Sequence, residues 1–461
     1  MEFVRSREVD AIKARLDHPI IDSDGHAVEY IPLVQEILRE QAGGELAEAF
    51  GMVANSAELV RHLSPEKRRE LRRHKQGWWA VPAANTLDRA TAMLPALMAR
   101  RMPELGLDHA MVYGTLGLSV TVLPDDDLRR AVARAFNTYY AEAFKDHRHL
   151  LTPVGVIPMF SPEEALAELD HATGVLGLKA FVFGGPIPRP HPQGGTWLDS
   201  LCVDGLYDYD PVWRRCVELG VAPTFHTAGA GWGSRTSPTS YVFNHIGMFA
   251  TGCEAMARAM FLGGVPHRFP ELRVAFQEGG VAWAASLYSD LIGHWEKRNR
   301  DAVRHYDPNA LDRRFIAELF DDYGESMFAG RSDLDDGLRF LSDPADDLAD
   351  EFAATGIETV DDIKRLFTDR FHFGCEADDP LTALAFDRRR IPLGARLKAI
   401  FASDIGHWDV PDARGVLPEA WELVEDGLAT EDDFRDLTYA NPLSLWAGAN
   451  PSFFEGTAIS A

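Results

Sequence analysis

The chain has 461 residues, of which 46% are hydrophobic and 10% aromatic, and its formal net charge is −25. This apolar content supports a large folded core and argues against intrinsic disorder, and the acidic balance argues against nucleic-acid and anionic-membrane partners, because phosphate binding requires a basic surface. The four cysteines form no Cys-x-x-Cys pair, the first twenty residues lack a signal-peptide core, and no apolar run reaches about 18 residues. We therefore expect a cytoplasmic protein with no membrane partner.

Short apolar stretches alternate with helical patterns along the whole chain. They predict eight strands, near 20–24, 110–114, 151–157, 178–183, 222–226, 272–278, 371–373 and 399–404. Helix starts lie between them: the acidic run Asp125–Asp127 suits a helix N-terminus, and Ser161 followed by Pro162 is typical of a cap. This order predicts an α/β protein with the (β/α)8 TIM-barrel fold. A doubly wound open sheet fits less well, because it would gather ligands at one switch point.

Two segments are too long to be simple connections between a strand and the next helix. They cover about residues 30–107, after the first strand, and 281–370, after the sixth. Because insertions of this length in a compact domain are usually functional, we predict that both are helical caps over the barrel mouth. No linker, repeat or low-complexity tract divides the chain, so residues 1–461 are predicted to form a single domain.

Four of the predicted strands end in residue types that bind metal ions. The first leads into Asp24 and His26, which are two residues apart and so share one face of the strand. The fifth strand ends at His226, the sixth at Glu278 and the eighth at Asp404. Because the carboxyl ends of barrel strands meet on one face, we expect these five side chains to converge in a metal site.

The ligand types leave the metal and the role of each carboxylate open. Mixed imidazole and carboxylate ligands suit Zn, Mn or Fe(II). Asp404 is predicted to be a ligand, a general base or both, and Glu278 to be the proton carrier if one metal ion is bound. If Glu278 instead bridges two ions, the set resembles a di-iron site, which opens an oxygenase hypothesis. His407 is either a further ligand or a partner that orients one.

Several motifs together resemble those of a known family. They are Ile21–Glu29, Trp78-Trp79, Gly263–Arg273, Gln277–Gly280 and Ser403–His407. They are similar to motifs of the amidohydrolase-related family, whose aminocarboxymuconate-semialdehyde decarboxylase type forms TIM barrels with one divalent metal. The resemblance extends over nearly the whole chain and also implies a homodimer.

The resemblance implies metal ligation by Asp24, His26, His226 and Asp404. Two positions depart from the family pattern. Asp24 stands where decarboxylases have the first histidine of a His-x-His pair, and Glu278 stands where they have the histidine of strand six that acts in acid–base chemistry. The first change keeps a ligand, whereas the second argues against the decarboxylase mechanism.

Candidate substrate-binding residues are aromatic or basic. Trp78, Trp79 and Trp232 are predicted to line an aromatic pocket. Arg89 and Arg235 are predicted to bind a substrate carboxylate, since arginine can contact both carboxylate oxygens. The candidate roles of His245 are pocket lining and helix packing, and Glu376 is left open as a pocket acid.

From these observations we expect a metal-dependent hydrolase that uses metal-activated water on a small organic substrate, including aromatic ones. The alternatives are a non-oxidative decarboxylase of an aromatic or unsaturated carboxylic acid, a non-haem di-iron oxygenase, and a metal-stabilised binding protein without turnover.

Overall fold

The computed structural model describes residues 3–77, 79–229, 231–339 and 349–459. Its centre is an eight-stranded sheet whose neighbouring strands are all parallel and follow one another in chain order. The strands are β1 (Ile21–Ala27), β2 (His109–Gly114), β3 (Leu151–Ile157), β4 (Ala180–Phe183), β7 (Pro223–Phe225), β8 (Val274–Phe276), β9 (Phe371–Glu376) and β10 (Lys398–Ala402). The predicted TIM barrel is confirmed.

The barrel closes where the first strand meets the chain that follows the last one. The backbone N–H of Asp404 donates to the carbonyl oxygen of Asp24 at 2.9 Å, and that of His26 donates to Ile405 at 2.8 Å. These two bonds lie at the predicted ligand positions. They therefore fix the two ends of the sheet relative to each other at the site itself.

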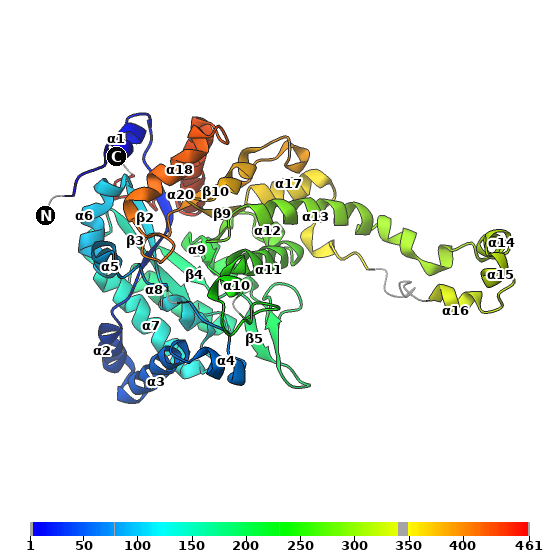
Figure 1. Cartoon of the computed structure of the whole chain (residues 1–461), viewed down its shortest axis with the longest axis horizontal. Helices are drawn as coiled ribbons and strands as arrows, with labels where there is room; N and C mark the ends of the chain where they lie inside the picture. The colour runs from blue at the N-terminus through cyan, green and yellow to red at the C-terminus, as the bar shows by residue number, and fades with distance from the viewer. Residues whose placement is uncertain (1–2, 78, 230, 340–348, 460–461) are drawn as a thin grey trace.

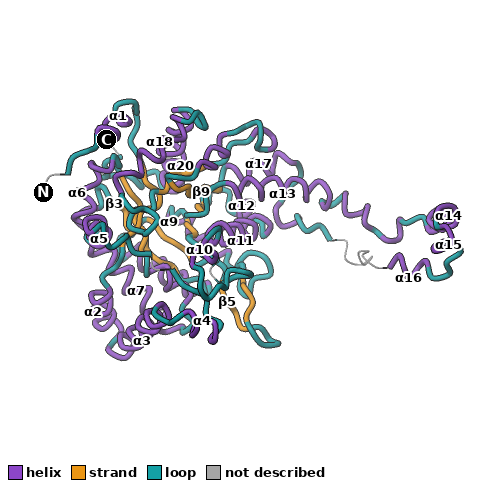
Figure 2. The backbone as a smooth tube through the Cα atoms, viewed as in Figure 1, coloured by secondary structure: helices purple, strands orange, loops and turns teal. Residues whose placement is uncertain are grey.

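Helices surround the sheet (Figures 1 and 2). The helices that follow the strands include α7 (Asp126–Ala143), α8 (Pro162–Gly174), α9 (Asp210–Leu219), α11 (Met248–Leu262), α13 (Ala282–Arg298), α17 (Val360–Thr368), α18 (Val416–Glu425) and α20 (Asn441–Ala449). Shorter helices are α1 (Arg7–Lys13), α10 (Tyr241–His245), α12 (Val265–Arg268) and α19 (Glu431–Arg435). The predicted helix N-terminal residues cap their helices: the side chain of Asp125 accepts a hydrogen bond from the N–H of Leu128, and that of Ser161 accepts one from the N–H of Glu164. No helix among the described residues has the length and apolarity needed to cross a membrane.

The strands bury apolar side chains on both faces. Along β4, Ala180 and Val182 belong to one buried cluster, whereas Phe181 and Phe183 belong to another. This alternation is what a strand requires, because successive side chains point to opposite faces. The cluster with Ala180 and Val182 combines side chains of the strands with those of the two helices that follow β1, of α7 and of α20, and the other joins the strands to helices such as α8, α9, α11 and α13. Burying one such phenylalanine contributes roughly 1.5–3 kcal/mol, so the sheet is a rigid support for its strand ends.

The first long segment packs beside the barrel. It contains α2 (Ile31–Ala42), α3 (Gly44–Arg61), α4 (Pro65–Leu71), α5 (Thr86–Met93) and α6 (Pro95–Leu105). α4 and the residues after it contact the loop after β7. The guanidinium of Arg68, in α4, donates to the carbonyl of Pro238 at 2.7 Å, and the backbone N–H of Lys75 donates to the carbonyl of Ser237 at 2.8 Å. The stretch between α4 and α5 is thereby held against that loop.

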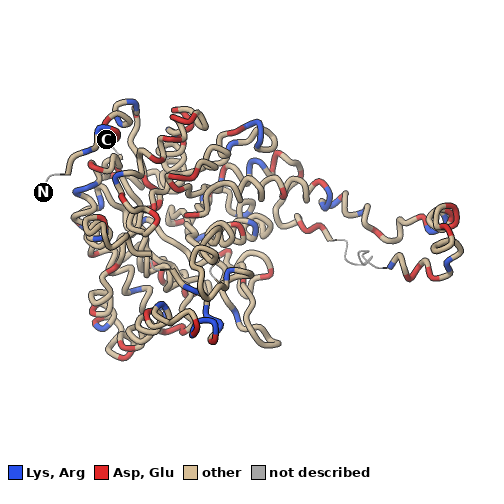
Figure 3. Tube along the Cα trace, in the orientation of Figure 1, with Lys and Arg blue, Asp and Glu red and all other residues tan. Residues whose placement is uncertain are grey.

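The second long segment extends away from the barrel. After α13 it forms an arm that carries α14 (Arg313–Tyr323), α15 (Glu325–Phe328) and α16 (Leu334–Arg339) (Figure 1). None of these three helices has a buried residue. The described arm therefore projects into solvent and does not cover the barrel mouth. Its charged side chains have both signs (Figure 3).

A two-stranded antiparallel hairpin, which the sequence analysis did not predict, follows β4. It pairs β5 (Ile187–Pro190) with β6 (Thr196–Asp199). The buried Arg189 joins the two strands, because its guanidinium donates to Asp199 of β6 at 3.0 Å. It also donates to the hydroxyl of Tyr209 at 3.1 Å, and this hydroxyl donates to the carbonyl of Met159 at 2.6 Å, which holds the hairpin to the barrel. The two prolines of β5 obscured the strand pattern.

Candidate metal centre

The predicted ligand residues meet at the carboxyl ends of four strands. Asp24 and His26 lie on β1, His226 directly follows β7, and Glu278 and Asp404 each lie two residues beyond the end of a strand. All five are buried, with exposed fractions between 0% and 7%. The sheet thus gathers these side chains from positions spread over most of the chain.

The potential ligand atoms lie close to one another. The Nε2 atom of His26 is 3.5 Å from Oδ1 of Asp24 and 3.3 Å from Oδ1 of Asp404. The Nε2 atom of His226 is 2.9 Å from Oε2 of Glu278 and 3.8 Å from Oδ2 of Asp24. Zinc–ligand bonds are about 2.0–2.2 Å long, so neighbouring ligand atoms lie about 3 Å apart. The spacing therefore suits a single small cation among these side chains.

Several of these atoms have no hydrogen-bond partner among the described residues. They are Oδ1 of Asp24, both ring nitrogens of His26 and of His226, both carboxyl oxygens of Glu278, and Oδ2 of Asp404. A buried polar atom without a partner costs about 1–3 kcal/mol, and a charged one costs more. A divalent cation would supply a partner to the carboxylate oxygens and to one nitrogen of each imidazole ring, and the mixed oxygen and nitrogen donor set fits such an ion.

Burial also controls the protonation of the cluster. It raises the pKa of Asp24, Glu278 and Asp404 well above that of an ordinary carboxyl group, and Glu278 raises the pKa of Asp404 further. It lowers the pKa of His26 well below the ordinary value, and that of His407 to about 3. The imidazoles are therefore neutral, which is the form that binds metal ions. The carboxyl groups release their protons easily only when positive charge lies beside them.

Two of the predicted ligands have an unusual backbone conformation. Glu278 has φ of 55° and Asp404 has φ of 51°, both in the left-handed region. Such a conformation costs a non-glycine residue of the order of 1–3 kcal/mol and persists only where the surroundings enforce it. At both positions it turns the chain sharply after the strand, which directs the carboxylate toward the histidines.

A hydrogen-bond network behind the cluster holds these strand ends. Gln277 donates from Nε2 to the carbonyl of Ser23 at 2.8 Å, and to the hydroxyl of Tyr113 at 3.0 Å. The backbone N–H and the hydroxyl of Ser403 both donate to Asp22, at 2.9 and 2.6 Å. The residue before each strained carboxylate is therefore bonded to β1.

His407 lies between the cluster and an aromatic wall. Its Nδ1 is 2.7 Å from Oδ1 of Asp404, and its ring stacks on that of His26 with centroids 3.9 Å apart. The geometry is that of an orienting partner for Asp404, and His407 also belongs to a group of potential ligands with His26 and Glu278. Both predicted roles of His407 therefore remain open.

Aromatic rings cover the outer side of the cluster. The indole of Trp79 lies 5.5 Å from His407, 5.8 Å from Phe249 and 6.2 Å from Tyr241, measured between ring centroids. Tyr241 in turn packs against Trp408 at 5.6 Å. Trp79 belongs to the stretch between α4 and α5, so this stretch covers the buried histidines. Trp78 lies outside the described residues.

The other predicted substrate-binding residues have different surroundings. His245 belongs to the aromatic wall, with its ring 5.4 Å from that of Trp79. Arg235 donates to the carbonyls of Ile246 and Gly247 at 3.1 and 3.0 Å, which fixes the chain after α10. Trp232 is half-buried in the turn after β7, and Arg89 is exposed on α5. The structure thus brings Trp79 and His245 to the cluster but not Arg89.

Two further acidic residues lie near the cluster. Glu376, which the sequence left open as a pocket acid, ends β9, and the pKa of its carboxyl group is raised well above the ordinary value, first by burial and then by Glu278. Asp409, which the sequence did not single out, lies two residues after His407, where one of its oxygens approaches Glu278 and His245.

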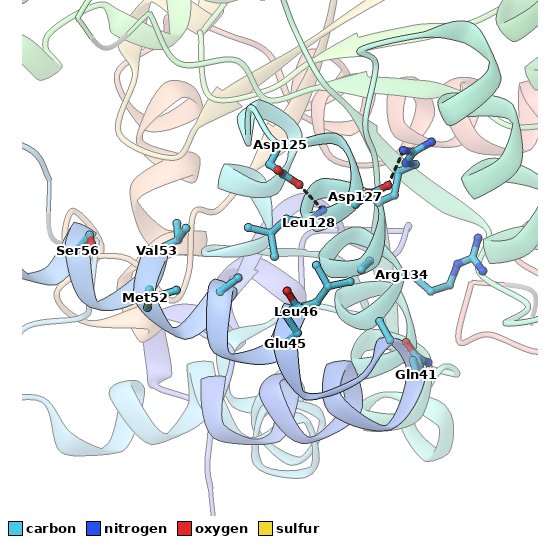
Figure 4. A pocket seen from close by; sticks show the side chains of 14 residues that line it. Gln41, Glu45, Leu46, Met52, Val53, Ser56, Asp125, Asp127, Leu128 and Arg134 are labelled. Carbon is cyan, nitrogen blue, oxygen red and sulfur yellow. Dashed lines mark hydrogen bonds and ion pairs between the residues drawn. The ribbon is translucent and has the colours of Figure 1, made fainter.

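A separate groove of about 1060 Å³ lies on the outer face, between α3 and the start of α7 (Figure 4). It is lined by Gln41, Ala42, Glu45, Leu46, Ala49, Met52, Val53, Ser56, Asp125, Asp127, Leu128, Arg130, Ala131 and Arg134. None of the candidate site residues is among them. The groove is therefore distinct from the metal cluster.

The chain is thus a parallel TIM barrel with buried carboxylate and imidazole groups, of types that can hold a metal ion, at its carboxyl-terminal face. The family model described as Amidohydrolase matches residues 21–327. The chain belongs to this amidohydrolase family, as its motifs predicted.

Relatives of established name include decarboxylases. A 2-amino-3-carboxymuconate-6-semialdehyde decarboxylase from Dictyostelium discoideum is 26% identical over 159 residues, which span 34% of this chain and 40% of that protein. An amidohydrolase from Mycobacterium avium subsp. paratuberculosis K-10 has a similar fold, with a TM-score of 0.55, 17% identity, and coverage of 94% of this chain and 98% of that one. A dihydroxybenzoic acid decarboxylase from Polaromonas sp. JS666, solved with manganese and 2-nitroresorcinol, has a TM-score of 0.53 at 14% identity. The match covers 93% of this chain and 97% of that one. The two structural matches support the fold alone.

Proposed function

We propose that the protein is a metal-dependent decarboxylase of a small aromatic or unsaturated carboxylic acid. The observation that carries this proposal is the aromatic wall of Trp79, Tyr241, Phe249 and Trp408 directly beside the buried carboxylate–imidazole cluster. Flat aromatic side chains are suited to hold a planar conjugated acid by stacking and edge contacts. The named decarboxylases among the relatives support the same choice over the hydrolase that the sequence alone favoured.

Asp24, His26, His226 and Asp404 would hold the divalent ion. A bound ion of this kind supplies Lewis-acid polarisation of a substrate carboxylate or neighbouring oxygen. Manganese is the ion in the Polaromonas decarboxylase structure, and this donor set also suits zinc or Fe(II).

Glu278 is the proton carrier in this proposal when one ion is bound. Burial raises its pKa well above that of an ordinary carboxyl group, which favours the protonated form that can act as an acid. During the reaction the bond between the substrate carbon and its carboxylate breaks, CO2 leaves, and the carbon takes the proton of Glu278. Glu278 regains a proton from solvent after product release. It thus takes the place of the histidine that the family resemblance leads one to expect.

The closed surroundings protect this proton transfer. Trp79 covers the cluster from the stretch between α4 and α5, and the five predicted ligand residues are at most 7% exposed. Water is therefore kept from competing with the substrate for the acid. The same stretch must move to admit a substrate, which makes it a candidate lid.

Hydrolysis is the second candidate, and one observation favours it. The Oε2 atom of Glu278 is only 2.9 Å from Nε2 of His226, so an ionised Glu278 would lie beside the metal, within reach of a bound water. A carboxylate there can take a proton from that water, as metal-dependent hydrolysis requires. The same residue thus serves either reaction.

The test is a screen of aromatic and unsaturated carboxylic acids, and of matching amides and esters, with protein that carries one manganese ion per chain. Decarboxylation predicts CO2 release and, in D2O, one deuterium at the carbon that lost the carboxylate. Glu278→Gln should lower kcat about 10²–10⁴-fold, the usual contribution of a positioned acid, whereas the exposed Glu296→Gln serves as the matched control. Incorporation of ¹⁸O from water into an acid product, without CO2, would instead establish hydrolysis.

A further inference from the structure

A second group of metal-binding side chains lies beside the first and shares Glu278 with it. His245 comes from α10, Asp409 from the loop after β10, and Glu278 from the end of β8. One potential ligand atom of each lies within 4.8 Å of the others. Three separate elements therefore deliver a nitrogen and two carboxylates to one point.

The atoms at this point have no partner among the described residues. They are Nε2 of His245, Oδ1 of Asp409 and both carboxyl oxygens of Glu278, and each is fully buried as an atom. The whole residue Glu278 is only 6% exposed. Burial without a hydrogen bond is costly for all three types of group, so the arrangement calls for a ligand between them.

The surrounding chain holds the three side chains in place. The ring of His245 lies 5.0 Å from that of Tyr241 and 5.6 Å from that of Trp408, which restrict its rotation. Arg235 fixes the chain just after His245 through its bonds to the carbonyls of Ile246 and Gly247. The left-handed backbone of Glu278 sets the direction of its carboxylate. A preformed site of this kind does not have to be ordered by the ion.

The number of carboxyl groups around these residues also favours a second cation. Asp24, Glu278, Glu376, Asp404 and Asp409 gather at this end of the barrel. Among the described residues, the ion pairs of these carboxylates are with histidines and not with lysine or arginine. One divalent ion cancels only two of the carboxylate charges. The remaining carboxyl groups can release their protons when a second cation lies beside them, which provides oxygen donors for it.

We propose that His245, Glu278 and Asp409 form a second divalent-cation site and that Glu278 bridges it to the first. One nitrogen and two carboxylate donors suit Mn, Fe(II) or Zn, with further positions open to water or substrate. The proposal goes beyond the proposed function, because a bridging Glu278 is a ligand at both ions and no longer carries a proton. Occupancy of the second site would thus decide which of its two roles Glu278 performs.

Metal content tests the proposal without any substrate. Protein freed of metal with a chelator and dialysed against increasing Mn²⁺ should bind two ions per chain. The paramagnetic resonance spectrum of the loaded protein should then show a spin-coupled pair, because bridged ions lie about 3.5–4 Å apart. Asp409→Asn and His245→Asn should each reduce the content to one ion with the spectrum of an isolated Mn²⁺. The exposed His294→Asn on α13 is the control and should keep two ions.

Three results would overturn the proposal. The first is saturation of the unaltered protein at one ion, and the second is retention of two ions by both variants, which would place the second ion elsewhere. Loss of both ions in both variants would show that the two groups form one inseparable site. The single ion that the proposal leaves in each variant also reports that the barrel is folded. The oxygenase hypothesis requires two iron ions per chain, so the same count bears on it.

Discussion

Removal of the divalent ion should lower the thermal stability of the protein by a predictable amount. Asp24, Glu278 and Asp404 are buried together, and a bound cation would give their unpartnered oxygens the contact that the described residues do not provide. An ion that binds the folded state alone stabilises it by RT ln(1 + [L]/Kd), which is about 2.7 kcal/mol at one hundred times Kd. The unfolded chain cannot form this cluster, because its ligands are spread from Asp24 to Asp404.

The expected change in Tm follows from chain length. An unfolding entropy of about 2.1 cal/mol/K per residue gives about 1 kcal/mol/K for 461 residues. Manganese at one hundred times Kd should therefore raise Tm by about 3 °C, and each further tenfold increase should add about 1.4 °C. Differential scanning calorimetry on chelator-treated protein, over a series of Mn²⁺ concentrations, measures this slope.

The variant Asp24→Asn provides the matched test. It removes one predicted ligand charge of the first ion at nearly constant volume, so the part of the rise in Tm that this ion contributes should largely disappear. Without metal, the variant should be at least as stable as the unaltered protein, since it buries one ionisable carboxyl group less. A Tm that does not respond to Mn²⁺ up to millimolar concentrations, or a full response in Asp24→Asn, would refute the metal centre described above.

Three further predictions concern the lid and the support of the barrel. Trp79→Ala should lower kcat/KM up to about tenfold in the decarboxylation assay, since an aromatic contact contributes up to about 1.5 kcal/mol. Trp79→Phe keeps an aromatic ring and should lower kcat/KM less. Equal losses of kcat/KM in the two variants would contradict a packing role of the ring. Asp88→Asn should cost up to about 3 kcal/mol in urea denaturation, because Arg101, 1% exposed, loses one of its two buried ion pairs and keeps only that with Glu104. An unchanged midpoint would contradict this. Burial lowers the pKa of His109 to about 4, so between pH 6.5 and 4 its ring takes up a proton in the unfolded chain before it does so in the folded protein. The free energy of unfolding should therefore fall by about 3 kcal/mol as the pH is lowered from 6.5 toward 4. His109→Gln should lack this loss, as urea denaturation at pH 7 and pH 4 would show.

The barrel was predictable because its elements carry local signals. Each strand is a short apolar stretch, and helix starts such as Asp125 and Ser161 have side chains that cap the first turn. The predicted ends of strands five, six and eight were too late, since β7 ends at Phe225, β8 at Phe276 and β10 at Ala402. The chain leaves the sheet there to turn its ligands inward, and apolarity does not reveal where a strand stops pairing.

The arm and the hairpin were less predictable. The arm shows a helical pattern of apolar residues, such as Phe315 and Leu319, and this pattern predicted a cap that packs on the barrel. In the structure both are exposed, at 56% and 37%. An amphipathic pattern indicates an apolar face but not what covers it. The hairpin was missed because prolines are unfavourable in most strands.

The inner part of the candidate site was predictable for a topological reason. Residues at the ends of parallel barrel strands converge wherever they lie in the chain, so Asp24, His226 and Asp404 could be grouped before any contact was known. His245 and Asp409 could not be assigned in this way. They reach the cluster through α10 and the loop after β10, and no periodicity in the sequence fixes how such segments fold back.

The type of side chain at position 278 should affect both the number of bound ions and the proton transfer. A carboxylate has two oxygens and can bridge two ions or carry a proton, whereas a neutral imidazole can carry a proton but offers only one lone pair to a metal. Glu278→His should therefore reduce the manganese content from two ions to one and still allow proton transfer, while Glu278→Gln should lose the proton transfer. A Glu278→His variant that retains two ions would show that Glu278 is not the bridge. A variant with one ion and no decarboxylation of a substrate that the unaltered protein accepts would show that position 278 does not carry the proton.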